Sequence, residues 1–443
     1  MCVYAYLVLP PQSCLDVNIF KTLIGLTFAF TIKIYLSYST VQIDRLIIYH
    51  SMIQRSLTLS DITHIQHIRQ EMPAVTSHLY MNTGTFGPMP TCVIETMQEQ
   101  LQKEWREGRL GAEVFDTMKT IYSNARTYVA SLLHAEVEEI ALTDNTGDGM
   151  NIIINGMNWQ EGDEVITTNH EHISALAPLY QNRDRYGITI RVADLGPFAE
   201  LSALEAIQTL ITARTRLIVL SHVTWTTGTL IDIHAVGQLG RRSGIPVLID
   251  GAQSAGAIPI DIKALDVDFY AIPMQKWLCG PDGTGALYVR RESLHYVTPT
   301  HVGYWSVKHE EGIEWELLDN AQCFEVGGRQ TAAVAGQAAV LHWFEEFVGY
   351  QWLYAHISSL HTYTFHALKK VKGLTLLTPE PGVSGLISFT LDGYDDSEVI
   401  KQLHEKYNIY IRNIPSKKCL RISTGFYNTE EEIDQFVQVL SNL

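Results

Sequence analysis

Lys276 is the residue of this 443-residue chain whose surroundings most suggest covalent chemistry. It lies in the segment Pro-Met-Gln-Lys-Trp-Leu-Cys-Gly-Pro, shortly after a predicted strand at 269–272. Neighbouring apolar side chains would desolvate the amine, and desolvation lowers the pKa of a lysine and frees it to form a Schiff base. A lysine that extends its charged end into solvent at a domain boundary would show the same local pattern, so other residues must decide between the two interpretations.

An acidic residue and an amide precede this lysine in the chain. Asp250 ends a predicted strand at 246–250, and Gln253 follows one helical turn later. A carboxylate at the end of a buried strand can keep a pyridine nitrogen protonated, which makes pyridoxal phosphate an electron sink. Gln253 could then donate a hydrogen bond to the phenolic oxygen of that cofactor. Asp250 could also cap the helix that follows, and the two roles are compatible.

Polar residues follow other predicted strands as well. Thr146 and Gly147 open a predicted helix, where free backbone amides suit a phosphate group. His172 follows the next strand, and its imidazole could stack on a cofactor ring or transfer a proton. The His-x-His spacing with His170 also fits a metal site, but no matching third and fourth ligands accompany it. For His222, after a further strand, a buried hydrogen bond is the simpler role.

These positions are set by an alternation of short apolar runs and amphipathic helical segments through the middle of the chain. The predicted strands are 140–143, 164–168, 189–192, 217–221, 246–250, 269–272 and 285–289. Such alternation predicts a mainly parallel sheet with helices on both faces and a site at the carboxyl ends of its strands. A long helical region over 332–370 and a smaller α+β region follow. The last helix begins at Thr429, in a capping box with Glu432.

Residues 1–51 differ in composition from the rest of the chain. Their longest central uncharged stretch lies between Lys21 and Lys33. As a helix it would span roughly 17 Å, short of the about 30 Å core of a bilayer. We expect an atypical hydrophobic extension without a function, with Met52 as an alternative start; a membrane anchor is the competing interpretation. The predicted domains are 1–51 as this extension, 52–90 as an N-terminal arm, 91–322 as the large cofactor-binding domain and 323–443 as a small C-terminal domain.

The overall composition argues against several classes of protein. With 46% hydrophobic and 18% charged residues, the chain is typical of a folded soluble protein. Its net charge of −16 argues against a nucleic-acid binder. Six cysteines without a CxxC pair argue against a disulfide framework and against a zinc site built on that motif. We therefore expect no metal, no nucleic-acid partner and no membrane attachment.

Taken in order, the motifs of the chain resemble those of the aminotransferase class V family of pyridoxal-phosphate enzymes, which includes cysteine desulfurases, cysteine/cystine C–S lyases and isopenicillin N epimerase. The matching motifs are Asn82-Thr83-Gly84, Asn145-Thr146-Gly147, Glu171-His172, Ser221-His222-Val223, Asp250-Gly251-Ala252-Gln253 and Lys276-Trp277. The resemblance covers roughly residues 71–440. It implies the α/β fold type I of these transferases: a large, mixed, mostly parallel seven-stranded sheet with a smaller α+β C-terminal domain. It also implies a cytoplasmic homodimer.

The resemblance further implies a role for each matching residue. Lys276 would form the Schiff base with pyridoxal 5'-phosphate, and Lys276 and His172 would be the catalytic residues. The cofactor would be bound by Thr146, Gly147, His172, Asp250, Gln253, Gln275 and Lys276. The substrate would be bound by Asn82, Gly84, Arg329 and Arg421. Of these, Arg421 would hold the substrate carboxylate, since a guanidinium group matches a carboxylate in two hydrogen bonds.

The chain departs from the family at the phosphate site. Pro273-Met274-Gln275 stands where the family has Ser-Gly-His, so a hydroxyl and a backbone donor are lost and Gln275 replaces an imidazole donor. Gly328 stands where the family has a phosphate-binding threonine. We therefore expect the cofactor phosphate to be held more weakly or by different groups.

The sequence leaves the reaction open. We expect chemistry on a small α-amino acid: β-elimination at a C–S bond, epimerisation or transamination. A persulfide-forming cysteine desulfurase is the alternative, ranked lower because Cys419 lies within a predicted strand and Cys279 and Cys323 do not occupy the family's mobile loop. A cofactor-binding protein with little catalysis is a further alternative, because of Pro273 and Gly328.

Overall fold

The computed structural model describes residues 59–311, 314–379 and 382–443, which belong to one compact unit within Met52–Leu443. The predictions made for residues 1–51 lie outside the described residues. Within the described ranges, no helix is both long enough and apolar enough to cross a bilayer.

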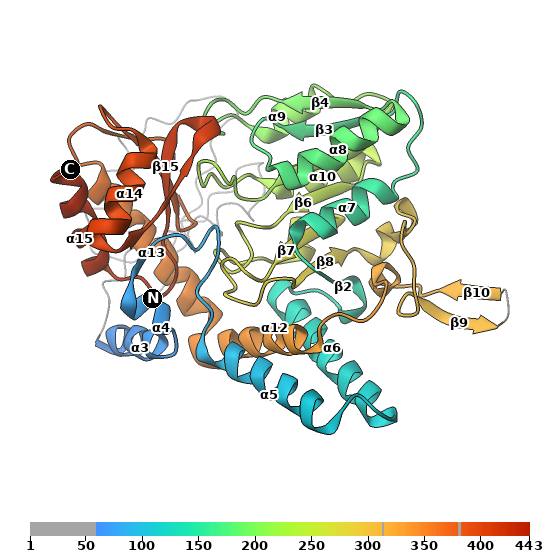
Figure 1. Cartoon of the computed structure of the whole chain (residues 1–443). Helices are drawn as coiled ribbons and strands as arrows, with labels where there is room; N and C mark the ends of the chain where they lie inside the picture. The colour runs from blue at the N-terminus through green and yellow to red at the C-terminus, as the bar shows by residue number, and fades with distance from the viewer. Residues whose placement is uncertain (1–58, 312–313, 380–381) are drawn as a thin grey trace, which may run out of the picture. The chain divides into compact units, whose positions relative to one another are not determined.

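A seven-stranded sheet forms the centre of the structure and confirms the predicted fold class (Figure 1). Its strand order is β2-β8-β7-β6-β5-β3-β4. The strands are β2 (Ile140–Thr143), β3 (Glu164–Thr168), β4 (Thr189–Ala193), β5 (Thr215–Ser221), β6 (Val247–Asp250), β7 (Phe269–Pro273) and β8 (Gly285–Val289). All neighbours run parallel except β8, which is antiparallel to both β2 and β7. The mainly parallel sheet predicted from the alternating pattern is therefore confirmed, and its mixed, seven-stranded form is the one that the family resemblance implies.

Both faces of this sheet are buried, which explains why its strands are nearly continuous apolar runs. On one face, side chains such as Ile249 and Ile272 pack with residues of α6 (Ala112–Leu133), α10 (Ile233–Ser243) and α12 (Thr331–Trp343). On the other face, side chains such as Leu248 and Ala271 pack with residues of α7 (Thr146–Gly156) and α8 (Ile173–Tyr186). Helix α12 also packs along α5 (Thr91–Glu107). The remaining short helices of this region are α9 (Ala203–Gln208) and α11 (Ile262–Leu265).

A second, antiparallel sheet lies in the C-terminal part of the chain and has the order β11-β12-β15-β14. Its strands are β11 (Leu374–Leu376), β12 (Leu386–Leu391), β14 (Arg412–Ile414) and β15 (Cys419–Ser423). They pack with α13 (Tyr350–Leu368), α14 (Asp396–Tyr407) and α15 (Glu430–Ser441). The capping box predicted at Thr429 and Glu432 is present at the start of α15.

The N-terminal arm joins the C-terminal sheet region to the rest of the structure. After helices α3 (Leu59–Gln70) and α4 (Pro73–Ser77), strand β1 (Leu79–Tyr80) pairs in parallel with β13 (Ile409–Tyr410). The arm then turns toward the lysine-bearing loop, where the Gly87 amide donates a 2.7 Å hydrogen bond to the Gln275 carbonyl.

Three features of the fold differ from the sequence prediction. Helix α6 was not predicted, although it buries a full side against the large sheet. The helical region 332–370 is interrupted by a π-helical turn at Phe344–Val348 and by Gly349, whose φ of 78° lies in the left-handed region that favours glycine. An antiparallel hairpin, β9 (Val307–Glu311) and β10 (Glu314–Leu317), projects from the large-sheet region in Figure 1 and was not predicted either.

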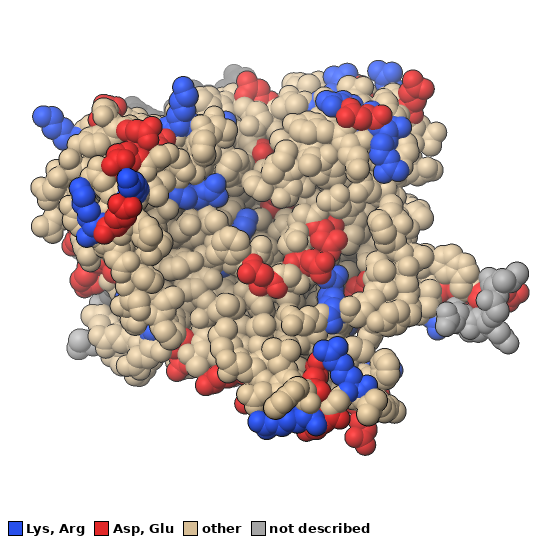
Figure 2. All heavy atoms as spheres, viewed as in Figure 1, with Lys and Arg blue, Asp and Glu red and all other residues tan. Residues whose placement is uncertain are grey.

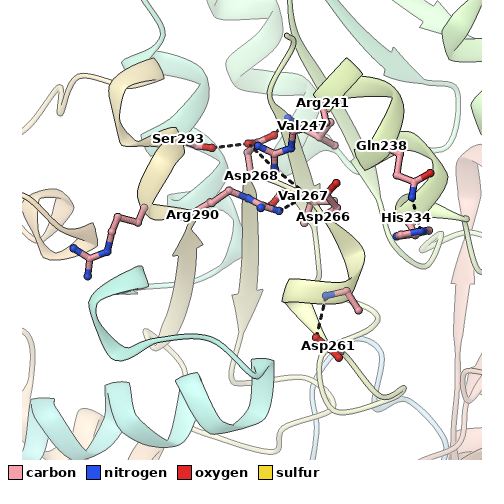
Figure 3. A network of polar contacts seen from close by, with 12 residues as sticks. His234, Gln238, Arg241, Val247, Asp261, Asp266, Val267, Asp268, Arg290 and Ser293 are labelled. Carbon is pink, nitrogen blue, oxygen red and sulfur yellow. Dashed lines mark hydrogen bonds and ion pairs between the residues drawn. The ribbon is translucent and has the colours of Figure 1, made fainter. Parts of the chain in front are cut away.

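A polar network fixes the amino ends of β6 and β7 (Figure 3). The Asp268 carboxylate accepts hydrogen bonds from the Val247 amide at 2.9 Å and from the Ser293 hydroxyl at 2.5 Å. Arg290 and Arg241 both pair with Asp266, each at 3.0 Å. Because this network holds the amino ends of β6 and β7, it also helps to fix the carboxyl ends of these strands, where the polar residues of the candidate active site lie.

Candidate active site

A cavity of about 270 Å³ lies at the carboxyl ends of the central strands. It is lined by Gly84, Thr85, Phe86, Asn145, Thr146, Gly147, His172, Ser174, Trp225, Asp250, Ala252, Gln253, Pro273, Gln275, Lys276, Arg412 and Arg421. Most of the predicted site residues are therefore in one place. Asn82 and Arg329 do not line this cavity.

Lys276 follows β7 and is partly buried at the cavity wall. Burial lowers the pKa of its amine to about 8, and the nearby Asp250 carboxylate opposes part of that shift. An amine with such a pKa is partly neutral close to physiological pH, which is the form that attacks an aldehyde.

Asp250 ends β6 and is only 4% exposed. Its carboxylate accepts a 2.9 Å hydrogen bond from the Ala252 amide and makes no ion pair with any cation of the described residues. A buried carboxylate that faces a cavity without a cationic partner is suited to a ligand that brings the positive charge itself. A protonated pyridine nitrogen is such a group.

Gln253 is held in one orientation by two neighbours. Its amide nitrogen donates to the Gly84 carbonyl at 2.9 Å, and its amide oxygen accepts from the Trp277 indole at 2.8 Å. One N–H of the amide therefore stays available to a ligand in the cavity.

His172 is the N-cap residue of α8. Its Nδ1 accepts a 3.2 Å hydrogen bond from the Ser174 amide, so Nδ1 carries no proton and the ring is neutral. Burial lowers the pKa of His172, and the Lys276 amine adds to that effect. The ring meets that of Trp225 edge to face, with centroids 5.2 Å apart. The imidazole is thus fixed at the cavity wall as an uncharged planar group.

The opening of α7 provides groups that fit a phosphate. The Thr146 hydroxyl and the Gln275 amide oxygen are both buried without a hydrogen-bond partner among the described residues. The two ends of an amide exchange by rotation, so Gln275 can offer its N–H instead. Asn145 caps the helix through a 3.0 Å bond from the Asp148 amide, and the free amides of the first turn carry partial positive charge. These residues therefore fit the phosphate of pyridoxal 5'-phosphate.

Two arginines also line the cavity and are close enough to Lys276 to lower its pKa further. Arg421, on β15, is 1% exposed; it donates to the Trp225 carbonyl at 2.7 Å and to the Thr85 hydroxyl at 3.2 Å, and its Nε has no partner among the described residues. Arg412, on β14, donates to the same Thr85 hydroxyl at 3.4 Å. Burial, followed by repulsion from Arg412, lowers the pKa of Arg421 to about 9. Within the described part of the chain neither guanidinium forms an ion pair with a carboxylate, so the part of the cavity beside these two arginines is suited to an anion.

Arg412 is not among the residues predicted from the sequence, because its position at the site depends on strand register. It lies directly opposite Arg421 in the antiparallel β14–β15 pair. An antiparallel pairing of the two short apolar segments that contain these arginines is the signal that could have identified it.

Arg329 and Asn82 occupy structural positions in this chain. Arg329 pairs with Asp144 at the start of α7, lies 3.8 Å from the Asp148 carboxylate and donates to the Leu142 carbonyl at 2.8 Å. The Asn82 amide oxygen accepts from the Thr85 hydroxyl at 2.8 Å. Their assignment to the substrate stays a prediction.

None of the four cysteines within the described residues lines the cavity. They are Cys92, Cys279, Cys323 and Cys419. Burial raises the pKa of Cys419 to about 11 and that of Cys323 to about 12, so both thiols are protonated at neutral pH. A thiolate nucleophile is therefore not part of this cavity as the described residues form it.

The Aminotransferase class-V family model matches residues 80–436 of the chain. A probable cysteine desulfurase of Methanothermobacter thermautotrophicus is 28% identical over 85% of this chain and 98% of its own length. A cysteine desulfurase of Pectobacterium atrosepticum is 29% identical over 86% of this chain and 98% of its own length.

Solved structures of the same kind superimpose on the chain. The cystine C–S lyase C-DES, in complex with its reaction product cysteine persulfide, matches with a TM-score of 0.80 at 28% identity, over 84% of this chain and 99% of its own. A C-DES variant with glycine covalently linked to the PLP cofactor matches equally well over 85% of this chain. The cysteine desulfurase CsdA of Escherichia coli has a TM-score of 0.76 at 26% identity, over 85% of this chain and 98% of its own.

Proposed function

The chain belongs to the aminotransferase class-V family of pyridoxal-phosphate enzymes, and from that membership we propose that it removes sulfur from a cysteine-type amino acid by cleaving its C–S bond. The observation that carries this proposal is the cavity itself. It brings together Lys276 and Asp250, which suit the cofactor, with Arg412 and Arg421, which suit an anionic substrate.

We assign the cofactor contacts to the residues whose groups fit it. Asp250 would hold the pyridine nitrogen, Gln253 the phenolic oxygen and Lys276 the aldehyde carbon. Thr146, Gly147 and Gln275 would hold the phosphate, and the flat ring of His172 would cover the cofactor ring. Bound pyridoxal phosphate supplies an electron sink that weakens the bonds of the substrate α-carbon.

The chain's own residues would orient the substrate and move its protons. Arg421 would bind the α-carboxylate, because a buried guanidinium with a free Nε can make the two-point contact that a carboxylate matches. Lys276 would take the proton from the α-carbon, since its pKa of about 8 lets it both accept and release a proton near neutral pH. His172, being neutral, adds no charge that would compete with these two.

Arg412 favours a substrate that carries a second carboxylate. Arg421 is buried and Arg412 is partly buried, and two cations that share one hydroxyl repel each other; an anion with two carboxylates would neutralise both. Cystine is a cysteine-type amino acid with two carboxylates, and C-DES, at 28% identity, is a cystine C–S lyase. With water, β-elimination of cystine would give pyruvate, ammonia and cysteine persulfide.

A persulfide-forming cysteine desulfurase is the second candidate. The names of the curated relatives support it more directly than they support elimination, epimerisation or transamination. In that reaction an enzyme thiol takes the sulfur of cysteine and leaves alanine. Three of the four described cysteines are buried and none of the four lines the cavity, which favours the lyase; Cys2 and Cys14 lie outside the described residues.

A homodimer and a cytoplasmic location stay predictions. Several large apolar side chains of the α5–α6 region are exposed, including Leu101, Trp105, Leu110 and Phe115. Trp105 is 80% exposed and Leu110 is 82% exposed. A group of large apolar side chains this exposed is unusual on a monomer and supports a second subunit that covers them. On the face drawn in Figure 2, acidic and basic side chains are interspersed, which gives no support for a nucleic-acid partner.

Product analysis tests the proposed function. The cofactor-loaded protein is incubated separately with L-cystine and L-cysteine, and pyruvate, ammonia, alanine and persulfide sulfur are measured. Pyruvate and ammonia in equal amounts from cystine support the lyase, whereas alanine from cysteine supports the desulfurase. Borohydride should attach the cofactor permanently to the wild-type protein. If it does not do so in Lys276→Ala while the wild type forms products, the assignment of Lys276 is supported. A cofactor-loaded protein that releases none of these products would overturn the proposal.

A further inference from the structure

Glu171 is a buried carboxyl close to the cofactor site that no step above uses. It is 7% exposed and lies between the end of β3 and the start of α8. Its two oxygens accept hydrogen bonds of 2.6 Å, one from the Thr168 hydroxyl and one from the Ser221 hydroxyl. Both bonds are short and both donors are buried, so the carboxyl has one fixed position.

Ser221 connects this carboxyl to Asp250. The two residues are register partners at the ends of the adjacent parallel strands β5 and β6. The amide of His222, the next residue, donates to the Asp250 carbonyl at 3.1 Å. Glu171 therefore supports the strand end that positions the carboxylate assigned to the pyridine nitrogen.

Opposing effects determine the pKa of Glu171. Burial is the largest effect and raises its pKa to about 7; the two hydroxyl bonds lower it, and the Asp250 carboxylate raises it. The other titratable groups around it are His222 after β5, which burial keeps neutral, and His170, whose pKa burial also lowers. Lys276 lies beyond Asp250, on the far side of β6. The next residue, His172, also has a pKa that burial lowers, and Glu171 is thus a group of this cluster whose charge changes near neutral pH.

We propose that Glu171 is a positioning residue for the cofactor: through Ser221 it holds the end of β5 beside Asp250, and its negative charge would add to that of Asp250, the residue that would hold the pyridine nitrogen. Ionised Glu171 favours the protonated pyridine, because a second nearby anion stabilises a cation. Protonated Glu171 removes that contribution. The inference needs a bound cofactor but does not depend on which substrate the enzyme takes.

The test is a pH titration of the substrate-free, cofactor-loaded protein, followed by its visible absorption. In wild type we expect a spectral transition with a midpoint near pH 7, and Glu171→Gln should abolish it while keeping the side chain's shape. Thr168→Val should move the midpoint upward by about one pH unit, because a hydrogen bond to the charged form is lost. The matched control is Glu139→Gln, a buried glutamate at the start of β2, away from the cavity; it should leave the titration unchanged.

Each outcome decides the proposal. The proposal is supported if the spectral transition is lost in Glu171→Gln and if its midpoint moves to higher pH in Thr168→Val. An unchanged titration in Glu171→Gln overturns it and leaves Glu171 a purely structural residue. If Glu171→Gln does not fold, Thr168→Val and Ser221→Ala decide alone, and the absence of a shift in both overturns the proposal. A protein that shows the transition but cleaves no C–S bond would refute the proposed function and leave this inference intact.

Discussion

Arg412 lies directly opposite Arg421 across β14 and β15, and both guanidinium groups donate to the single hydroxyl of Thr85. Like charges placed opposite each other destabilise a strand pair, so this arrangement needs a compensating anion. Both side chains line the cavity, so the anion's place is within it. The two arginines therefore form a cationic part of the cavity wall.

Removal of Arg412 should discriminate between the two sulfur amino acids. We expect Arg412→Ala to lower kcat/KM for cystine about tenfold more than for cysteine, equivalent to about 1.4 kcal/mol, because only cystine has a second carboxylate. Steady-state rates with both substrates measure this difference. Arg421→Ala is the comparison, and it should lower kcat/KM for both substrates by about 100-fold or more. Equal losses with both substrates in Arg412→Ala would contradict a second carboxylate site.

The unpaired hydroxyl of Thr146 should contribute to cofactor affinity. We expect Thr146→Val to weaken binding of pyridoxal phosphate to the apo-protein about tenfold, because one hydrogen bond to a charged group is lost. Fluorescence titration with the cofactor measures the dissociation constant. Thr167→Val is the matched control, since Thr167 is equally buried and unpaired but lies outside the cavity. Similar affinity losses in both variants would mean that the effect comes from folding and not from the phosphate.

The buried pair of Arg126 and Glu325 should be important for stability. Two hydrogen bonds of 3.0 and 2.8 Å join them, and Glu325 also accepts from the Leu142 amide at 3.0 Å. We expect Arg126→Met to lower the free energy of unfolding by about 3–5 kcal/mol, because it leaves a buried charge unpaired. Urea denaturation measures this change.

Two further variants control that result. The double variant R126M/E325M should be less destabilised than R126M, since no buried charge is left without its partner. Arg183→Met removes an exposed ion pair with Asp184 and should change stability by less than about 1 kcal/mol. An R126M variant as stable as Arg183→Met would show that the buried pair is not needed.

His222 should make the protein less stable in mild acid. Burial lowers its pKa to about 3, whereas an unfolded histidine has a pKa near 6.5. Between these values the unfolded chain binds a proton that the folded chain does not, so stability falls as the pH falls, by about 1.4 kcal/mol per pH unit. Urea midpoints at pH 5, 6 and 7 measure the slope. It should be shallower in His222→Gln and unchanged in His67→Gln, because His67 is exposed.

The sequence was sufficient to place much of the cofactor end of the site. Asp250, His172 and Lys276 each follow a short apolar run, and the carboxyl ends of neighbouring strands meet at one edge of a sheet whatever the loops do. The order of the motifs added the family, which the match over residues 80–436 confirms. The apolar runs indicated the strands, and the geometry of parallel sheets brought their carboxyl ends together. The prediction therefore did not require knowledge of long-range contacts.

The arginines of the cavity could be predicted only in part: the family resemblance indicated Arg421 but not Arg412. Arg412 depends on the register of β14 against β15, which forms only when the C-terminal sheet is assembled. Arg329 resembles a substrate residue in sequence, but Asp144 and Asp148 occupy its guanidinium group in the folded chain. Which partner Arg329 takes depends on distances in the folded chain, and these distances cannot be read from the neighbouring sequence.

Gly87 shows how closely two distant parts of the chain must approach. A Cβ at this position would lie 2.0 Å from the Lys276 carbonyl oxygen and 2.8 Å from the Cys279 sulfur, so no other residue fits without displacing the lysine loop. The same arm is joined to β13 through β1. The arm therefore contacts both the strand that precedes Arg412 and the loop that carries Lys276, so a side chain added at position 87 would press directly on the backbone of the lysine.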